Sequence, residues 1–290
     1  MSTDNDKIHQ LPCWNGAITI ALLSGGLSNA NYLVIDAGGK HVVRFGMDYP
    51  CHHVFREREV MVARAAYEAG FAPAVEYAEP GVMVTAYIEG KTFSAADVRA
   101  NAVRIGRVIH DFHSILPQMI TGPGFMFWVF HVIRDYAHTL RNVGVGDFLA
   151  QSRAFEAAQI PLPIIFGHND LLPANFIDDG HKLWLIDFEY AGFGTAMFDL
   201  AGASSNSQMN PEEQAQLLST YFGREPDAAT MQSFAAMECA SLLRETLWAK
   251  VSSLFLAAPG VDYDAYAIDN VMRYIAALER YQTQYGKITA

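Results

Sequence analysis

Short apolar runs separated by glycines dominate the first third of the chain. Residues 17–36 and 41–46 are rich in β-branched and apolar side chains, and the sequence DAGGK at 36–40 is typical of a hairpin turn. Two further runs flank the turn EPG within 74–90. This pattern predicts five strands, as expected for a small β-rich lobe.

Helical periodicity appears once inside this region and dominates after it. Apolar positions repeat at the helical period over 54–73 and again over 94–116, where Ser94 is a good N-cap. The chain from Pro211 onward is also largely helical in pattern, whereas the stretch directly after Asp199 resembles a loop. One exception is a predicted hairpin over 176–188, where two β-like runs flank DDG.

These elements predict an α+β chain with two lobes. Residues 1–89 would form a small β-rich N-terminal lobe, and residues 90–290 a larger, mainly helical lobe. Composition agrees with a compact protein, because 51% of the 290 residues are hydrophobic and only 18% are charged.

Charge narrows the choice of partner. The chain has 31 Asp and Glu residues against 20 Lys and Arg residues, which gives a formal net charge of −11. A nucleic acid is therefore not expected as a partner, since binding to a phosphate backbone needs a basic face. The acidic balance is compatible with a cationic small substrate, and equally with ordinary solubility.

Cysteine usage and hydropathy indicate the compartment. The three cysteines are scattered and form no Cys-x-x-Cys pair, which favours a reducing environment. The first ten residues are polar, and the strongest apolar run, 125–133, is much shorter than the ~20 residues of a membrane span. We expect a cytoplasmic protein that does not insert into a membrane.

Candidate chemistry is concentrated in the sequence HNDLLPAN at 168–175. Asp170 and Asn175 lie five residues apart with a proline between them, and Asp187 follows Asn175 by twelve residues and precedes Phe188. In kinases this spacing supplies an aspartate that receives a hydroxyl proton, then an asparagine and an aspartate that bind magnesium. Each residue alone is more simply a turn cap or a strand end, but the combination favours phosphoryl transfer.

The predicted N-terminal lobe offers an independent check. A phosphate-binding turn needs glycines between two strands, and Gly25 and Gly26 meet that requirement. Arg44 on the later strand 41–46 would supply a cation, and Glu59 on the predicted helix is a plausible partner for it. A glycine turn by itself is usually only a hairpin, so this support depends on the order of the motifs.

The sequence resembles the choline/ethanolamine kinase branch of the aminoglycoside phosphotransferase-like kinases over most of its length. The segments that carry the resemblance are GGLSN at 25–29, VVRF at 42–45, HNDLLPAN at 168–175 and IDFEYAG at 186–192. The resemblance implies a two-lobed protein-kinase-like fold with ATP between the lobes. It also implies that Gly25, Gly26 and Ser28 cover the ATP phosphates.

The resemblance assigns a role to each remaining residue of the ATP site. Arg44 would bind phosphate and pair with Glu59, and the backbone from Thr85 to Ile88 would receive the adenine. Asp170 would be the catalytic base, with Mg²⁺ held by two ligands, Asn175 and Asp187. His168 would shape the loop rather than carry a proton.

Substrate residues are implied near Tyr190 and on a C-terminal helix. Aromatic faces attract quaternary ammonium groups, and Tyr190 and Trp248 occupy positions where the family has such rings. Trp248 is equally plausible as a core residue. Eukaryotic choline kinases carry a pocket carboxylate a few residues after a Phe-Asp pair, which in this sequence is Phe198-Asp199. The matching position here is Asn206, and Glu245 could substitute for the missing carboxylate.

The expected reaction is therefore transfer of the γ-phosphoryl group of ATP to the hydroxyl of a small amine alcohol, choline or ethanolamine, with Mg²⁺ as cofactor. Three alternatives stay open. The first is a kinase for thiamine, an aminoglycoside or a sugar, and the second is a nucleotide-binding pseudokinase. The third is a metal hydrolase that uses His168 and Asp170, although the sequence supplies too few further ligands nearby. His110 and His113 have a spacing that could bind a transition metal, but they too lack further ligands.

Overall fold

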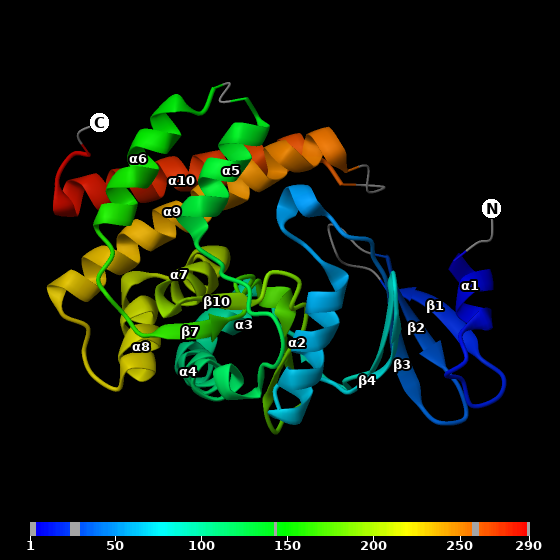
Figure 1. Ribbon diagram of the computed structural model, residues 1–290. Helices are drawn as coiled ribbons and strands as arrows, with labels where there is room; N and C mark the ends of the chain where they lie inside the picture. The colour runs from blue at the N-terminus through cyan, green and yellow to red at the C-terminus, as the bar shows by residue number, and fades with distance from the viewer. Residues whose placement is uncertain (1–3, 24–29, 142–143, 257–260, 289–290) are drawn as a thin grey trace.

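The computed structural model describes residues 4–23, 30–141, 144–256 and 261–288. Its N-terminal part is an antiparallel five-stranded sheet in the order β1-β2-β3-β5-β4. The strands are β1 (Thr19–Leu23), β2 (Ala30–Ile35), β3 (Lys40–Phe45), β4 (Val75–Glu79) and β5 (Val82–Ala86). The five predicted strands are therefore present, and Figure 1 shows them to one side of the helical part.

Local sequence explains the β2–β3 hairpin. The Asp36 carboxylate accepts hydrogen bonds from the N–H groups of Gly38 at 2.6 Å and Gly39 at 3.0 Å. Gly39 has φ +148°, which a residue with a Cβ rarely adopts. The turn fixes the register so that Ile35 faces Lys40.

A small apolar core lies under this sheet. Val34, Val43 and Val84 from three neighbouring strands pack with Ile8 and Leu11. Ile8 belongs to α1 (Asp4–Gln10), which the sequence pattern did not predict. A helix of seven residues with one buried side chain gives too little periodicity to detect.

Helix α2 (Arg56–Glu68) has its apolar side in the larger core of the molecule. Val62, Ala63 and Ala66 pack there together with Phe71 and residues of the helical lobe. The two lobes therefore share α2 as a packed element. In Figure 1 it runs between the sheet and the helices.

Eight helices form most of the described C-terminal part: α3 (Ala95–Ala100), α4 (Ala102–Met119), α5 (Val129–Thr139), α6 (Gly146–Ala157), α7 (Ala196–Ser207), α8 (Pro211–Phe222), α9 (Ala228–Phe255) and α10 (Tyr263–Tyr285). Helix α9 is buried along most of its length and contacts α5, α6, α7 and α10. Figure 1 shows α9 and α10 side by side. None of the helices in the described ranges has the length and apolarity that crossing a membrane requires.

Short strands support the loops between these helices. Strand β7 (Ile164–Gly167) pairs with β10 (Gly192–Thr195), and β8 (Phe176–Asp178) pairs with both β6 (Lys91–Thr92) and β9 (Leu183–Leu185). The single-turn 3₁₀ helices are η1 (Pro50–His52) and η2 (Pro173–Asn175). The predicted hairpin over 176–188 is thus formed, with Gly180 at φ +88° in its turn.

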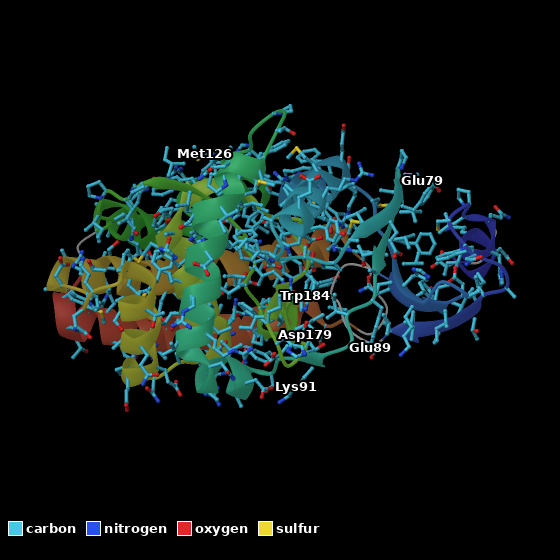
Figure 2. All side chains as sticks on the ribbon, turned by 90° about the horizontal axis from the view of Figure 1, so that it is seen from below. Glu79, Glu89, Lys91, Met126, Asp179 and Trp184 are labelled. Atoms are coloured by element: carbon cyan, nitrogen blue, oxygen red, sulfur yellow. The ribbon has the colours of Figure 1, made fainter. Side chains whose placement is uncertain are left out.

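The connection between the lobes lies directly against this hairpin. A Cβ atom at Gly90 would lie 2.7 Å from the carbonyl oxygen of Asp178, so this close approach requires glycine. Figure 2 shows Glu89 and Lys91 beside Asp179 and Trp184 at this junction. The end of the N-terminal lobe is therefore fixed to the hairpin that directly follows the candidate motif at 168–175.

Two predicted features differ in the structure. The helix predicted over 94–116 is two helices, α3 and α4, which meet at Asn101, and Ser94 and Asp97 form a capping box at the start of α3. The segment after Asp199 is not a loop but the buried helix α7, followed at Asn210 by the capped start of α8. Small and polar residues are common in loops, so this segment resembled one in sequence. In the structure the same small residues allow α7 to pack closely against α9.

Candidate active site

The loop after β7 is held in place by one buried carboxylate, that of Asp199. The backbone N–H groups of His168 and Asn169 each donate to it at 2.7 Å, and His113 Nε2 lies 2.8 Å from it. Burial by itself would raise the pKa of Asp199, but the hydrogen bond from His113 and the nearby donors lower it overall. Asp199 is therefore a charged anchor at the base of the loop.

His168 is completely buried, and its Nε2 lies 2.9 Å from the carbonyl oxygen of Ile186. Burial lowers the pKa of His168, so the ring is neutral and its Nε2–H donates to that carbonyl. His168 thus joins the loop to the strand that leads to Asp187. This contact agrees with the loop-shaping role expected for it.

Asp170 and Asn175 face the same space from the two ends of this loop. The side-chain amide nitrogen of Asn175 donates to the carbonyl oxygen of Asp170 at 2.7 Å. The amide oxygen of Asn175 is thereby left available on the other side of the group. The N–H of Ile186 donates to the carbonyl oxygen of Asn175 at 3.2 Å, so the hairpin returns Asp187 to the site.

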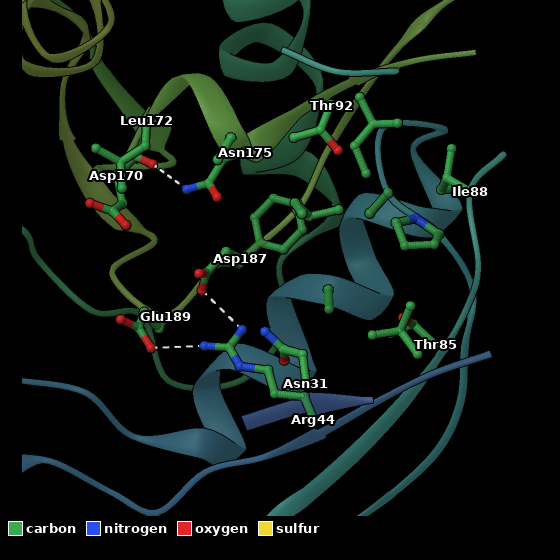
Figure 3. A pocket seen from close by; sticks show the side chains of 18 of the residues that line it. Asn31, Arg44, Thr85, Ile88, Thr92, Asp170, Leu172, Asn175, Asp187 and Glu189 are labelled. Carbon is green, nitrogen blue, oxygen red and sulfur yellow. Dashed lines mark hydrogen bonds and ion pairs between the residues drawn. The ribbon is translucent and has the colours of Figure 1, made fainter. Parts of the chain in front are cut away.

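Asp187 meets Arg44 across the junction of the lobes. Asp187 Oδ1 lies 2.9 Å from Arg44 Nη1, and Figure 3 shows Asp187 between Arg44 and Asn175. Arg44 also pairs with Glu59 at 2.5 Å and with Glu189 at 2.9 Å. Burial would lower the pKa of Arg44, but Asp187, Glu59 and Glu189 together raise it, so the guanidinium stays charged.

Two residues of this network escaped sequence analysis. Arg56 Nη1 lies 2.7 Å from Glu59 and 2.9 Å from Glu189. Burial raises the pKa of Glu189, and the negative charge of Asp187 raises it further. The positive charges of Arg44 and Arg56 oppose this rise. Glu189 had a possible signal in the motif DFEY, but Arg56 is one of several charged residues at the start of a helix.

Asp170 lies at the end of the site away from Arg44. Burial raises the pKa of Asp170 well above its usual range; nearby Arg244 opposes this effect, and Glu245 adds to it. Arg244 Nη1 lies 3.7 Å from Asp170 Oδ1. The position therefore combines a carboxylate of raised proton affinity with a buried cation.

Aromatic side chains and Glu245 complete this end. The indole N–H of Trp248 donates to the hydroxyl of Tyr190 at 2.9 Å, and the Tyr266 hydroxyl donates to Glu245 at 3.1 Å. Arg244, which sequence analysis missed, lies 4.3 Å from the ring centroid of Tyr190. A buried arginine next to Glu245 in an apolar helix was the signal that could have identified it.

One cavity of about 500 Å³ joins these groups. The residues expected from sequence that line it are Arg44, Thr85, Ile88, Asp170, Asn175, Asp187, Tyr190, Glu245 and Trp248. Glu59 lies behind Arg44 and is 2% exposed. Gly25, Gly26 and Ser28 lie outside the described residues.

The far end of the cavity from Asp170 is apolar. Val42, Ala72, Met83 and Ile186 line it together with the segment from Thr85 to Ile88, which Figure 3 shows at the side of the pocket opposite Asp170. The N–H groups of Ala86 and Tyr87 already donate to the carbonyl oxygens of Ala74 and Lys40. This end of the cavity is therefore apolar, and the backbone of residues 85–88 lies at its edge.

Other candidate groups do not line the cavity. Asn206 lies on α7 and does not line the cavity, whereas Glu245 does. His110 contacts Asp111, and His113 is used by Asp199 and Tyr221. Within the described ranges, no three His, Cys, Asp or Glu side chains are grouped closely enough to hold a metal ion.

A β-rich lobe joined by a short connection to a helical lobe, with Asp170, Asn175 and Asp187 at their junction, defines a protein-kinase-like fold. The chain belongs to the phosphotransferase enzyme family, whose model matches residues 19–235.

Named relatives agree with this assignment. Protein LicA of Haemophilus influenzae is 28% identical over 210 residues, which are 68% of this chain and 61% of LicA. The chain therefore spans about three fifths of the length of that relative. The crystal structure of a choline/ethanolamine kinase family protein from Mesorhizobium loti has a TM-score of 0.78 and 29% identity, over 95% of this chain and 94% of that one. A LicA structure in complex with AMP has a TM-score of 0.74 at 21% identity, over 95% and 96% of the two chains.

Proposed function

We propose that this protein transfers the γ-phosphoryl group of ATP to the hydroxyl of a small amine alcohol, choline or ethanolamine. The observation that carries the proposal is the single cavity in which Asp170, Asn175, Asp187 and Arg44 meet an aromatic and acidic end. The likeness to a choline/ethanolamine kinase family protein along nearly its whole chain supports the substrate class. Residues 1–89 and 90–290 would act as the two lobes, with ATP between them.

The residues present fit magnesium and a nucleotide. Asn175 has its amide nitrogen bound to Asp170, so its oxygen is free as a ligand, and Asp187 adds a carboxylate. Mg²⁺ prefers such oxygen ligands and usually keeps waters and phosphate oxygens as the others. When bound, the ion would neutralise charge on the phosphates.

Arg44 would hold the phosphates at the centre of the site. It lines the cavity with a guanidinium that stays charged, and such a group favours a phosphate there. Pairing with Glu59 keeps the guanidinium oriented. The apolar end of the cavity near Ile88 would take the adenine, and a LicA structure that contains AMP supports a nucleotide in this family.

Asp170 would orient the substrate hydroxyl and accept its proton. The raised pKa makes its carboxylate a better proton acceptor than an exposed aspartate. Tyr190, Trp248 and Glu245 would surround the ammonium group of the alcohol beyond it. The presence of Asp170, Asn175 and Asp187 along one cavity, where they could act as base and metal ligands, disfavours the pseudokinase alternative.

A turnover assay tests the proposal. ATP consumption is measured with a panel of choline, ethanolamine, thiamine, an aminoglycoside and a sugar. We expect turnover with choline or ethanolamine, and a fall in kcat of about 10²–10⁴-fold in Asp170→Asn, because general-base catalysis has this magnitude. Turnover of only another alcohol would contradict the substrate class, and full activity of Asp170→Asn would contradict the role of Asp170.

A further inference from the structure

Glu245, a carboxylate that lines the cavity together with Tyr190, Trp248 and Tyr266, already accepts hydrogen bonds from the chain itself. Its Oε1 accepts a hydrogen bond from Arg244 Nη1, and its Oε2 accepts one from the Tyr266 hydroxyl at 3.1 Å. Glu245 is 6% exposed and Arg244 only 2%, so solvent does not screen this pair. The charge of Glu245 is thus balanced before any substrate binds.

Arg244 also fixes the neighbouring aromatic ring. Its guanidinium carbon lies 4.3 Å from the centroid of Tyr190, and the Tyr190 hydroxyl accepts the indole N–H of Trp248. One face of Tyr190 is therefore used by a cation of the chain. The rings of Trp248 and Tyr266 also line the cavity at this end.

The two classes of ammonium group differ in what they need from such a site. A primary ammonium has three N–H donors, and each donor left without an acceptor in a buried site costs free energy. A fully methylated ammonium has no donor and is attracted by aromatic faces and by negative charge. Each oxygen of Glu245 already accepts one hydrogen bond, so fewer of its lone pairs remain for a primary ammonium, whereas a fully methylated ammonium donates no hydrogen bond to it and loses none.

We propose that Arg244 determines the substrate class of this site: by occupying Glu245 it biases the enzyme toward alcohols with a fully methylated ammonium over primary amine alcohols. This inference rests on the proposed function, because it takes an amine alcohol as the acceptor. Arg244 acts here as a specificity-determining residue, since it removes an acceptor that a primary ammonium would use.

The test is the ratio of kcat/KM for choline to kcat/KM for ethanolamine, measured with one enzyme preparation. Because both values come from the same active enzyme, partial unfolding or slower chemistry cancels from the ratio. We expect the wild type to favour choline. In Arg244→Met the ratio falls about tenfold, because an acceptor for a charged donor becomes free.

A second variant and a matched control complete the test. Tyr266→Phe removes only one hydrogen bond from Glu245 and keeps the ring, so it should lower the ratio about threefold even where Arg244→Met fails to fold. The matched control is Arg273→Met, because Arg273 donates to the carbonyl oxygen of Ser205 and does not line the cavity. Its ratio should equal that of the wild type.

The outcomes separate this inference from the proposed function. A wild type that favours ethanolamine, or a ratio unchanged in both Arg244→Met and Tyr266→Phe, would overturn the role of Arg244 and leave the proposed function intact. Turnover of neither alcohol would overturn the proposed function, and the inference with it.

Discussion

Two residues of the site have a left-handed backbone conformation, which residues other than glycine rarely adopt. Asn169 has φ +62° and Asp187 has φ +69°. Such residues persist only where surrounding contacts over-determine them, and they are frequent at functional sites. The amide of Asn169 donates to the carbonyl oxygen of Tyr190 at 3.1 Å, and the Asp187 carboxylate is held by Arg44. The first contact holds the backbone next to Asp170, and the second holds the Asp187 carboxylate at the cavity.

The metal role of Asp187 can be tested through its charge. Asp187→Asn keeps the size of the side chain but removes the carboxylate and its ion pair with Arg44. We expect the Mg²⁺ concentration for half-maximal turnover to rise about 10–100-fold, because loss of ligand quality has this effect on metal affinity. Asp111→Asn is the control, since that side chain is 50% exposed on the surface. An unchanged Mg²⁺ dependence would contradict the assignment.

At the scale of elements, helix α9 organises the helical lobe. Its C-terminal half supplies Arg244, Glu245 and Trp248 to the cavity. Its N-terminal half carries Glu238, which accepts hydrogen bonds from Ser204 of α7 at 2.7 Å and Gln214 of α8 at 2.9 Å. A single rigid helix therefore joins the packing of α7 and α8 to the site.

Glu238 predicts a pH dependence of stability. Burial raises the pKa of Glu238 from 4.5 to about 7. The folded chain thus binds more protons than the unfolded chain between these values, so the contribution of Glu238 to the free energy of unfolding falls as the pH rises through this window. Glu238→Gln removes the titration and can still accept both hydrogen bonds. Its stability relative to the wild type should rise by up to ~3 kcal/mol between pH 4.5 and pH 8.

Urea denaturation of both proteins at the two pH values provides the measurement. The free energies of unfolding of the wild type and the variant are compared at the same pH, so the contributions of the other titrating groups cancel from the difference. A difference that stays constant from pH 4.5 to pH 8 would show that Glu238 does not retain its proton in the folded chain.

At the scale of the molecule, a buried ion network joins two apolar cores. Arg44 comes from the sheet, Arg56 and Glu59 from α2, and Asp187 and Glu189 from the segment between β9 and β10. The smaller core lies under the sheet and the larger one extends from α2 through the helices. The network therefore closes the junction where the cavity lies.

Breaking this network should cost far more than breaking a surface pair. Glu189→Gln leaves Arg44 and Arg56 with less compensating charge, and we expect a loss of about 3–5 kcal/mol in the free energy of unfolding. Arg224→Gln is the comparison, because its pair with Asp227 is more than half exposed and should contribute under about 1 kcal/mol. Similar midpoints of chemical denaturation for the two variants would contradict a structural role for the network.

The sequence predicted much of the site because its chemistry is local. Asp170, Asn175 and Asp187 lie within one short segment, a loop followed by a hairpin, so their spacing carried the information, and the structure places all three along one cavity. Arg244 and Arg56 could not be found in this way. Each also has a partner close in sequence, but the contacts that bring them into the site are with Asp170 and Tyr190 for Arg244 and with Glu189 for Arg56, which lie far away in the chain, so neither periodicity nor spacing marks them.

By itself, the sequence determined the two-lobed α+β character, the five strands and the catalytic loop with its hairpin. These depend on alternation, on turn residues and on short-range spacing, which act within a few residues of each other. Only the tertiary structure decided that the segment after Asp199 is a helix, that Asp199 anchors the loop, and that Glu245 is already paired. These depend on which side chains meet at burial, and burial turns a charge that water would screen into one that needs a specific partner.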